Sequence, residues 1–298
     1  MSRDGNIGNT ELLDAGLLAR LERLQLVNRR RLAGGLAGEH RSPRHGSSLD
    51  FADFRDYHPG DDIRRLNMGA LARLDRLLIT LFDAEDELNL RLLVDTSASM
   101  AGPKLERAVE LAAAVGFCAL VRRDVVSLHS FPNPQPGPRF RGRGMTNALF
   151  EALGQLQAEG ATSFVAAAND LLAHPGPPGL TIVISDLLTP DWDDGITRLP
   201  ARRGEFGVIH VLAPSDLDPT ADPELAGDME LVDAETGNRI EVSLSDSVFN
   251  DYRQLAQRWV DDVAGRVRAN GGTYLQVSTT DDLEQTLLGR ARDAGVLR

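Results

Sequence analysis

An apolar run that ends in an acid and two hydroxyl residues constrains this chain more than any other feature. Residues 90–94 form the run, and Asp95, Ser97 and Ser99 follow at alternate positions. A short run rich in Leu and Val is typical of a buried strand. Because alternate residues of an extended chain point to the same side, one carboxylate and two hydroxyls can face a common point beyond the strand. Oxygen donors of this kind suit Mg²⁺ or Mn²⁺.

The same spacing has a second interpretation. A helix is expected to begin near Pro103, because proline favours the first helical turn. In that interpretation Ser97 or Ser99 only caps the helix. We favour the metal site because the motif lies between a buried strand and a helix.

A second apolar run, residues 180–185, ends at another acid, Asp186. In open α/β sheets, ligands bind beyond the carboxyl ends of the parallel strands. Two strands that each end in an acid therefore predict that Asp95 and Asp186 lie on the same edge of the sheet. This coincidence is independent of the first motif and favours a cation site there.

The order of the predicted elements indicates an α/β fold. A helical stripe over 105–119 separates strand 90–94 from strand 125–131. A connection of this length can join two parallel strands, and such connections are right-handed. We predict a doubly wound, mostly parallel sheet with helices on both faces. Further strands are expected at 206–212 and 274–277, and a β-hairpin at 229–242. Further helices are expected at 146–157, 247–269 and 281–296, together with one that ends at about residue 173. In helix 247–269, Leu255, Trp259 and Val263 recur at four-residue spacing and are expected to be buried.

The composition limits the possible partners and compartments. Of 298 residues, 42% are apolar and 26% are charged, an ordinary balance for a globular protein. The net charge is −12 and Lys104 is the only lysine, so nucleic acid, which binds basic surfaces, is not an expected partner. No apolar run approaches the roughly 20 residues that span a bilayer. Because residues 1–10 are also polar, we expect a cytoplasmic protein without a transmembrane segment.

Cys118 is the only cysteine, which excludes an internal disulfide. It lies within a helical pattern of apolar residues, so it is expected to be a small buried side chain rather than a nucleophile.

The first 86 residues are less regular. Leucines at three- and four-residue spacing predict an amphipathic helix over 9–28, and a Gly-rich stretch at 34–48 predicts a long loop. A group of acids then lies among arginines 55, 64 and 65: Asp53, Asp56, Asp61 and Asp62. The group is either a cation cluster or part of a turn. We favour a turn in which Asp61 caps a short helix and the arginines pair with the acids.

Three stretches, 53–64, 72–73 and 90–100, together resemble the bacterial domain-of-unknown-function 58 family. The resemblance extends from about residue 20 to the C-terminus. It implies a von Willebrand factor A-like domain behind a less regular N-terminal region, and we place the boundary between residues 86 and 87, giving domains 1–86 and 87–298. The family tends to have Asp-Trp where this chain has Asn67 and Met68, so the local contact made by that pair is open.

The resemblance also implies a metal-ion-dependent adhesion site, or MIDAS. In such domains the second loop of the site supplies a threonine just before a helix, and Thr162 is the matching residue, although a plain N-cap is the alternative. The predicted metal ligands are Asp95, Ser97, Ser99, Thr162 and Asp186. The family further implies a partner protein that offers an acidic side chain, and an adaptor role beside a MoxR-type AAA ATPase.

Two other functions remain open. A Mg²⁺-dependent phosphoester hydrolase would use the same acids with a cationic group such as Lys104 or Arg143. No catalytic motif accompanies these residues, and the sequence has neither a P-loop nor a G-x-G-x-x-G motif after a strand. A structural scaffold with a vestigial site is the third possibility.

Overall fold

The computed structural model describes residues 12–27, 49–58, 61, 63, 66–84, 88–132, 137–174, 176–202, 204–221, 227–232 and 237–298. The chain divides into two compact units, one made of residues 1–28 with 88–298 and the other of residues 29–87.

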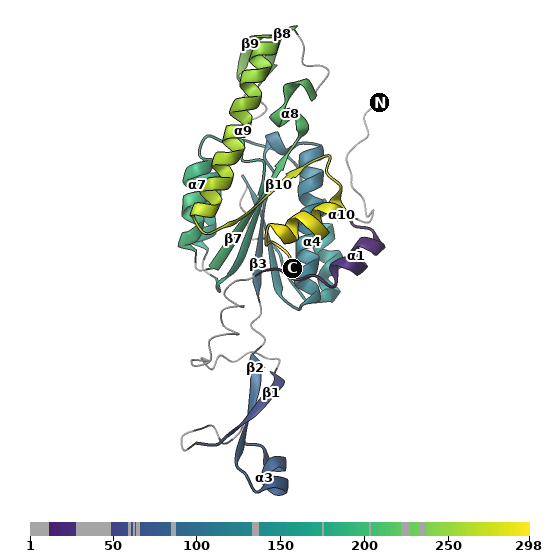
Figure 1. The fold of residues 1–298 in the computed structure, drawn as a ribbon, viewed down its shortest axis with the longest axis vertical. Helices are drawn as coiled ribbons and strands as arrows, with labels where there is room; N and C mark the ends of the chain where they lie inside the picture. Colours follow the sequence, from purple (N-terminus) through teal and green to yellow (C-terminus); the bar gives the residue numbers. More distant parts are fainter. Residues whose placement is uncertain are drawn as a thin grey trace. The chain divides into compact units, whose positions relative to one another are not determined.

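Six strands of the large unit form one sheet in the order β10-β7-β6-β3-β4-β5 (Figure 1). Only the pair β4 and β5 is antiparallel, and all other neighbours are parallel. The predicted α/β fold with a mostly parallel, Rossmann-like sheet is therefore confirmed. The strands are β3 (Asn89–Asp95), β4 (Val125–Phe131), β5 (Arg139–Arg141), β6 (Gly179–Ser185), β7 (Gly204–Leu212) and β10 (Thr273–Ser278).

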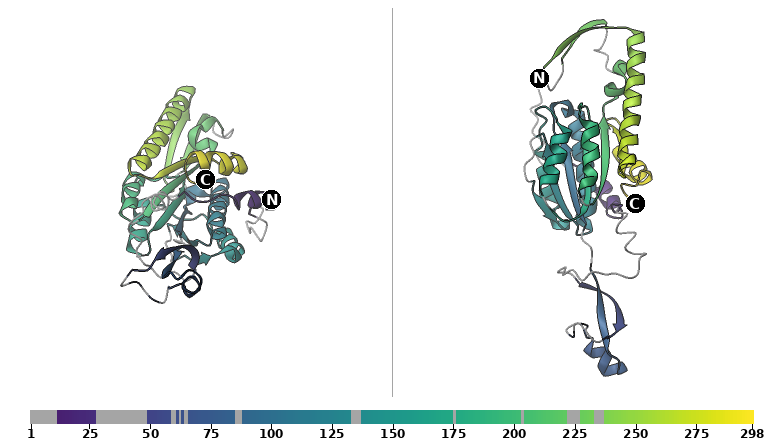
Figure 2. Two further views of the ribbon diagram at one scale, coloured as in Figure 1. Left: turned by 60° about the horizontal axis from the view of Figure 1, so that its bottom comes forward. Right: turned by 90° about the vertical axis from the view of Figure 1, so that its left-hand side faces the viewer.

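Helices cover both faces of this sheet (Figure 2). One apolar cluster lies between the sheet and α4, and a second lies on the opposite face beneath α6, α7 and α9. The helices are α4 (Pro103–Val121), α5 (Thr146–Gly154), α6 (Phe164–Ala173), α7 (Trp192–Arg198), α8 (Pro214–Leu217), α9 (Asp246–Ala269), α10 (Leu283–Gln285) and α11 (Ala291–Asp293). Pro103 is the first residue of α4, as the sequence predicts. No helix in the described ranges has the length and apolar character needed to cross a bilayer.

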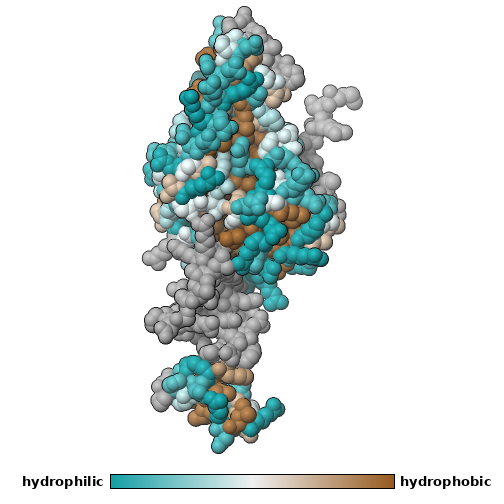
Figure 3. All heavy atoms as spheres, viewed as in Figure 1, coloured by the Kyte–Doolittle hydropathy of each residue, from teal (hydrophilic) through white to brown (hydrophobic). Residues whose placement is uncertain are grey.

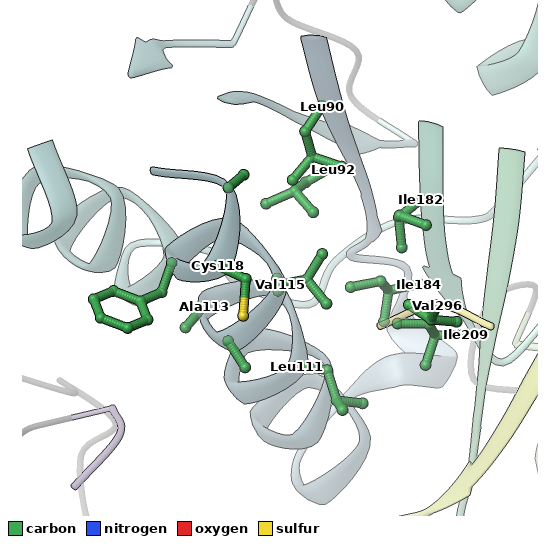
Figure 4. Packing of buried hydrophobic residues seen from close by; sticks show 14 of the residues in the cluster. Leu90, Leu92, Leu111, Ala113, Val115, Cys118, Ile182, Ile184, Ile209 and Val296 are labelled. Atoms are coloured by element: carbon green, nitrogen blue, oxygen red, sulfur yellow. The ribbon is translucent and has the colours of Figure 1, made fainter. Parts of the chain in front are cut away.

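Helix α4 packs closely against the sheet. The side chains of Leu111 and Val115 lie on the side of the helix that faces Ile182 and Ile184 of β6 (Figure 4). A Cβ atom at Gly116 would come within 2.6 Å of Leu149 Cδ2, so glycine allows α5 to approach. Cys118 is fully buried on this helix, as predicted, and burial raises the pKa of its thiol to about 12.

The N-terminal helix belongs to the large unit. Helix α1 (Ala15–Leu21) is shorter than predicted, begins after Asp14, whose Oδ1 accepts the N–H of Leu17 at 2.9 Å, and buries Leu17 and Leu21. The apolar stripe needs a partner surface, which α4 and its neighbours supply. The predicted boundary at residue 86 thus assigns α1 to the wrong side, because its leucines are part of the main core. The predicted loop at 34–48 lies outside the described residues.

The small unit contains an antiparallel pair, β1 (Leu49–Asp56) and β2 (Leu78–Ala84), and helix α3 (Met68–Leu74). Asn67 is the N-cap of α3, since its Oδ1 accepts the N–H of Ala70 at 2.8 Å, a role that aspartate also performs. Met68 is 67% exposed, and apolar side chains are visible on the surface of this unit (Figure 3). The departure from the family pattern at 67–68 therefore preserves the cap.

The acids of the small unit form ion pairs with arginines. Arg55 Nη2 lies 2.5 Å from Asp61 Oδ1, and Arg76 Nη2 lies 2.7 Å from Asp56 Oδ1. Asp61 Oδ2 also accepts the N–H of His58 at 2.8 Å. Hydrogen bonding by Arg55 lowers the pKa of Asp61 to about 2. These contacts agree with the turn interpretation for Asp61, while Asp62, Arg64 and Arg65 lie outside the described residues.

The hairpin and the long helix after β7 differ in how well the sequence predicted them. Strands β8 (Gly227–Val232) and β9 (Arg239–Leu244) form the expected antiparallel hairpin. In α9, however, Leu255 is 62% exposed, so its predicted burial is wrong. Val263 is buried as predicted, and Trp259 is partly buried against the same apolar cluster. The buried residues of α9 are Ala256, Val260, Val263, Ala264 and Val267. Four-residue spacing drifts around a helix of 3.6 residues per turn, so it does not place Leu255 and Val263 on the same face.

Candidate metal centre

The two acids predicted to share an edge lie at the ends of adjacent strands. Asp95 is the last residue of β3, Asp186 directly follows β6, and the two strands pair in parallel register. Both residues are buried, at 0% and 1% exposure. The carboxyl edge of the sheet therefore holds two buried carboxylates close to one another.

Asp95 accepts hydrogen bonds from three directions. Its Oδ1 accepts the N–H of Ser97 at 2.9 Å and the hydroxyl of Thr162 at 3.4 Å. Its Oδ2 accepts the hydroxyl of Ser185 at 2.5 Å. The carboxylate is thus fixed in position by backbone and hydroxyl donors.

The predicted hydroxyls lie in the loop that leaves β3. Ser97 Oγ and Ser99 Oγ are 3.0 Å apart, and neither makes a side-chain cap of a helix. The N-cap of α4 is Gly102, and the N-cap of α6 is Ser163 rather than Thr162. The capping alternative for these three hydroxyls is therefore wrong. The hydroxyls of Ser97 and Thr162 contact Asp95, and that of Ser99 contacts Ser97.

Backbone hydrogen bonds hold the two loops of the site together. The N–H of Ala98 donates to the carbonyl of Gly160 at 2.9 Å, and the N–H of Glu159 donates to the carbonyl of Thr96 at 2.8 Å. Asp191 fixes the second loop further, because its Oδ2 accepts the Ser163 hydroxyl at 2.7 Å and its Oδ1 accepts the N–H of Phe164 at 3.0 Å. Burial opposes ionisation of Asp191, but these hydrogen bonds outweigh it and lower its pKa.

Lys104 occupies the position beside Asp186. Its Nζ lies 2.7 Å from Asp186 Oδ2 and 3.4 Å from Asp216 Oδ2, and the residue is 8% exposed. Lys104 is the second residue of α4, so the helix that follows the serine loop delivers the only lysine of the chain to the acid after β6. The ammonium group of Lys104 thus lies within the site.

The two carboxylates have different environments. Burial, followed by the negative charge of Asp186, raises the pKa of Asp95 to about 6, against the opposing hydrogen bonds of Ser185 and Ser97. Asp186 is paired with the ammonium group of Lys104, whereas Asp95 has only neutral donors. Asp95 is therefore the carboxylate whose negative charge lacks a cationic partner in the described part of the chain.

His210 of β7 positions the backbone of Asp186. Its Nε2 lies 2.8 Å from the carbonyl oxygen of Asp186, and its Nδ1 lies 2.8 Å from the hydroxyl of Tyr274. The ring is fully buried, and this burial lowers its pKa to about 4, so the imidazole is neutral at pH 7. Leu187, the next residue after Asp186, has a φ of 52°, a strained conformation for leucine, and its N–H donates to Ser185 Oγ at 2.9 Å.

Comparison with protein families supplies the identity of the chain at the family level. The profile described as "Protein of unknown function DUF58" matches residues 53–260. The chain belongs to the DUF58 family. The match includes both loops of the site and all five predicted ligands, so the geometry above lies in the part of this DUF58 protein that the family shares.

Several relatives of this DUF58 protein are named as uncharacterized. Uncharacterized protein Rv1480 of Mycobacterium tuberculosis and uncharacterized protein Mb1516 of Mycobacterium bovis are each 30% identical to it over 287 residues, which covers 90% of this chain and 87% of theirs. Among solved structures, the conserved hypothetical protein BatB from Bacteroides thetaiotaomicron aligns with a TM-score of 0.41 and 15% identity, over 70% of this chain and 98% of that chain.

Sequence reasoning missed Ser185 and His210, and it considered Lys104 only as a cationic group for the hydrolase alternative. Ser185 directly precedes the predicted ligand Asp186, and His210 lies inside a predicted strand, where packing is the ordinary role of a histidine. Lys104 carried a stronger signal, since it is the only lysine and stands two residues into the helix that follows the serine loop. Arg143, the other cation considered, forms an ion pair with Glu22 and does not contact the site acids.

Proposed function

We propose that the edge of the sheet formed by Asp95, Ser97, Ser99, Thr162 and Asp186 binds Mg²⁺ or Mn²⁺ and, through it, an acidic side chain of a partner protein. The observation that supports this most is the environment of Asp95. A fully buried carboxylate with only neutral hydrogen-bond donors carries a large desolvation penalty, which a bound cation removes.

The residues present fit a hard cation. The donor set consists of two carboxylates and three hydroxyls, which are oxygen ligands of the kind that hard cations prefer. Within the described ranges, no group of three His, Cys, Asp or Glu adds further ligands. Mg²⁺ is commonly held by one or two carboxylates and retains exchangeable positions. When bound, the metal supplies a positively charged coordination position that an external carboxylate can occupy.

Lys104 makes the site incomplete without a partner. Its ammonium group pairs with Asp186 and also lies near Asp216, so it offsets part of the negative charge that the protein offers a cation. A carboxylate from a partner protein restores the missing charge. Weak binding of the metal alone and tighter binding in the complex are the expected consequences.

The von Willebrand factor A-like character and the MIDAS mechanism belong to this proposal, as does a MoxR-type AAA ATPase as the partner. They rest on the sequence resemblance of the motifs at 53–64 and 95–99. An adaptor that presents a metal-dependent surface to such an ATPase is the function we infer.

The direct experiment measures binding of the purified protein to a purified MoxR-type ATPase from the same genome by surface plasmon resonance. We expect saturable binding with Mg²⁺, loss of binding in EDTA and in Asp95→Ala, and unchanged binding in Asp194→Ala, which removes an exposed acid elsewhere. Binding of equal strength with Mg²⁺ and with EDTA would contradict the proposal.

One observation favours a second candidate, a metal-free structural role. The Lys104 ammonium group can itself be the cation that the acids require, in which case the edge is a closed ion pair. Titration of Mn²⁺ into the wild type distinguishes the two functions, because a closed ion pair leaves no saturable metal binding as long as Lys104 is present.

The hydrolase alternative lacks a comparable observation. Both ring nitrogens of His210 and the ammonium group of Lys104 already have partners, and Arg143 pairs with Glu22. Turnover of p-nitrophenyl phosphate that disappears in Asp95→Ala would nevertheless establish it over the adaptor function.

A further inference from the structure

A second site lies on the same face of the sheet as α6, at the opposite end of the strands from the acids. It is a cavity of about 240 Å³ between the first residues of β3, the strand β4 and the C-terminal end of α6. Arg91 and Asp95 lie on the same strand four residues apart, so the two sites are separated by about 13 Å along β3.

The lining of this cavity is strongly cationic. Arg91, Arg139 and Arg202 contribute three guanidinium groups, and His129 and His174 lie among them. Within the described ranges, Asp170 is the only acid of the lining. The sum is about two positive charges with both histidines neutral, in a chain whose net charge is −12. Such a concentration of positive charge is unexpected for a packing defect.

Arg91 has an unsatisfied donor in this cavity. The residue is 5% exposed, its Nη2 donates to the carbonyl of Pro177, and its Nη1 is buried without a hydrogen-bond partner. A buried guanidinium N–H group without an acceptor is costly, and native proteins usually provide one. The cavity is the space in which that acceptor can be accommodated.

Arg202 approaches the same point from the other side. Its Nη1 donates to the carbonyl of His174 at 2.6 Å, and its Nε is also buried without a partner. A Cβ atom built at Gly176 would lie 3.0 Å from Arg202 Nη2 and 4.0 Å from Arg91 Nη2, so both guanidinium groups end beside the Gly176 backbone. Burial, and then the charges of Arg202 and Arg139, lower the pKa of Arg91 to about 10, as expected for like charges held together.

We propose that this cavity binds the phosphate group of a small phosphate monoester, with the buried Arg91 and the half-buried Arg202 as donors and Arg139 at the entrance. A phosphate monoester carries about −1.5 to −2 charges at pH 7, which matches the excess positive charge better than a single carboxylate does. Guanidinium groups bind phosphate oxygens through paired N–H donors. The cavity volume restricts the ligand to inorganic phosphate or a short ester.

Isothermal titration of the full chain in EDTA, at constant ionic strength, tests this site. The probes are inorganic phosphate, glycerol phosphate and acetate. We expect saturable binding of a phosphate probe, no binding of acetate, and a preference for glycerol phosphate over inorganic phosphate if the ester part occupies the cavity. Affinity for phosphate should fall at least about tenfold in Arg139→Met, which is exposed and leaves the fold intact, and binding should vanish in Arg91→Met.

Arg141→Met is the matched control, since Arg141 lies two residues along the same strand and outside the lining. It should bind phosphate like the wild type. Absence of saturable phosphate binding in the wild type, equal binding of acetate, or equal loss in Arg139→Met and Arg141→Met would each overturn the proposal. Asp95→Ala should leave this binding unchanged, so the result is independent of the metal site.

Discussion

The ammonium nitrogen of Lys104 lies 2.7 Å from Asp186 Oδ2, and the side chains of the two residues are only 10% and 2% exposed. The only lysine of the chain thus neutralises one of the two acids at the carboxyl edge of the sheet. Asp95, the other acid, is left with hydroxyl and backbone donors. This asymmetry determines how the site responds to a metal, to pH and to mutation.

Replacing Lys104 with Met should increase the affinity for Mn²⁺ by about tenfold or more, because it removes a like charge beside the metal. The same change should lower the free energy of unfolding in EDTA by about 3–5 kcal/mol, since Asp186 becomes a buried carboxylate without a cation. Isothermal titration and urea denaturation measure the two effects.

Arg122→Met is the control for this variant, because it removes one positive charge from the exposed far end of α4. Arg122→Met should change neither the Mn²⁺ affinity nor the free energy of unfolding. Unchanged Mn²⁺ affinity in Lys104→Met would mean that Lys104 does not compete with a metal.

Asp95→Asn should stabilise the metal-free protein at neutral pH. The pKa of Asp95 is raised to about 6 in the folded protein from an ordinary value of 3.8. The folded state therefore retains the proton to higher pH than the unfolded state, and the stability that protonation gives is lost as pH rises from 3.8 through 6. The advantage of Asp95→Asn should be absent near pH 4 and reach on the order of 3 kcal/mol above pH 6.

Urea denaturation in EDTA at pH 4 and pH 7 checks this difference. The titration of His210 affects the wild type and the variant alike, so it cancels in the comparison. A wild-type protein that is more stable than Asp95→Asn at pH 7 without metal would contradict the assigned environment of Asp95.

His210→Phe should lower the free energy of unfolding at pH 7 by about 2–4 kcal/mol, because it leaves the Tyr274 hydroxyl and the Asp186 carbonyl without their partner. It should also weaken Mn²⁺ binding, since His210 fixes the backbone of Asp186. Tyr274→Phe removes only the first of these contacts. Tyr274→Phe should lower the free energy of unfolding by about 1–2 kcal/mol and leave Mn²⁺ binding unchanged. Equal Mn²⁺ affinity in His210→Phe and Tyr274→Phe would exclude a positioning role for His210.

The two faces of α9 should respond differently to truncation. Leu255 is 62% exposed and Val263 is fully buried. Leu255→Ala should change the free energy of unfolding by less than about 0.5 kcal/mol, whereas Val263→Ala should lower it by about 2 kcal/mol. Thermal and urea denaturation measure both changes. A large loss of unfolding free energy in Leu255→Ala would show that Leu255 is buried, as the four-residue spacing predicted.

Local patterns carried most of the information about the fold. The apolar runs at 90–94 and 180–185 predicted two buried strands, and the rule for parallel sheets brought Asp95 and Asp186 to one edge, as the structure has them. The hairpin and the start of α4 at Pro103 followed from turn and capping preferences. The two strands, the hairpin and the helix start each depend on residues close together in the sequence, whereas only the general rule for parallel sheets brought the two distant acids together.

Features that depend on distant partners were missed. The leucines of α1 predicted a helix but not the surface it covers, so the domain boundary was placed after it. Lys104 and Asp186 are separated by 82 positions in the sequence, and their contact exists only because the fold brings the start of α4 to the end of β6. His210 meets Asp186 only because β7 neighbours β6, a strand order that the sequence pattern does not specify.

Isothermal titration of Mn²⁺ and Mg²⁺ into the wild type, Asp95→Ala, Asp186→Ala and Asp194→Ala tests the central claim most directly. The account predicts weak saturable binding to the wild type and to Asp194→Ala, and none to the two site variants. Absence of saturable binding in the wild type and in Lys104→Met alike would contradict a metal site and favour a closed ion pair at the edge of the sheet.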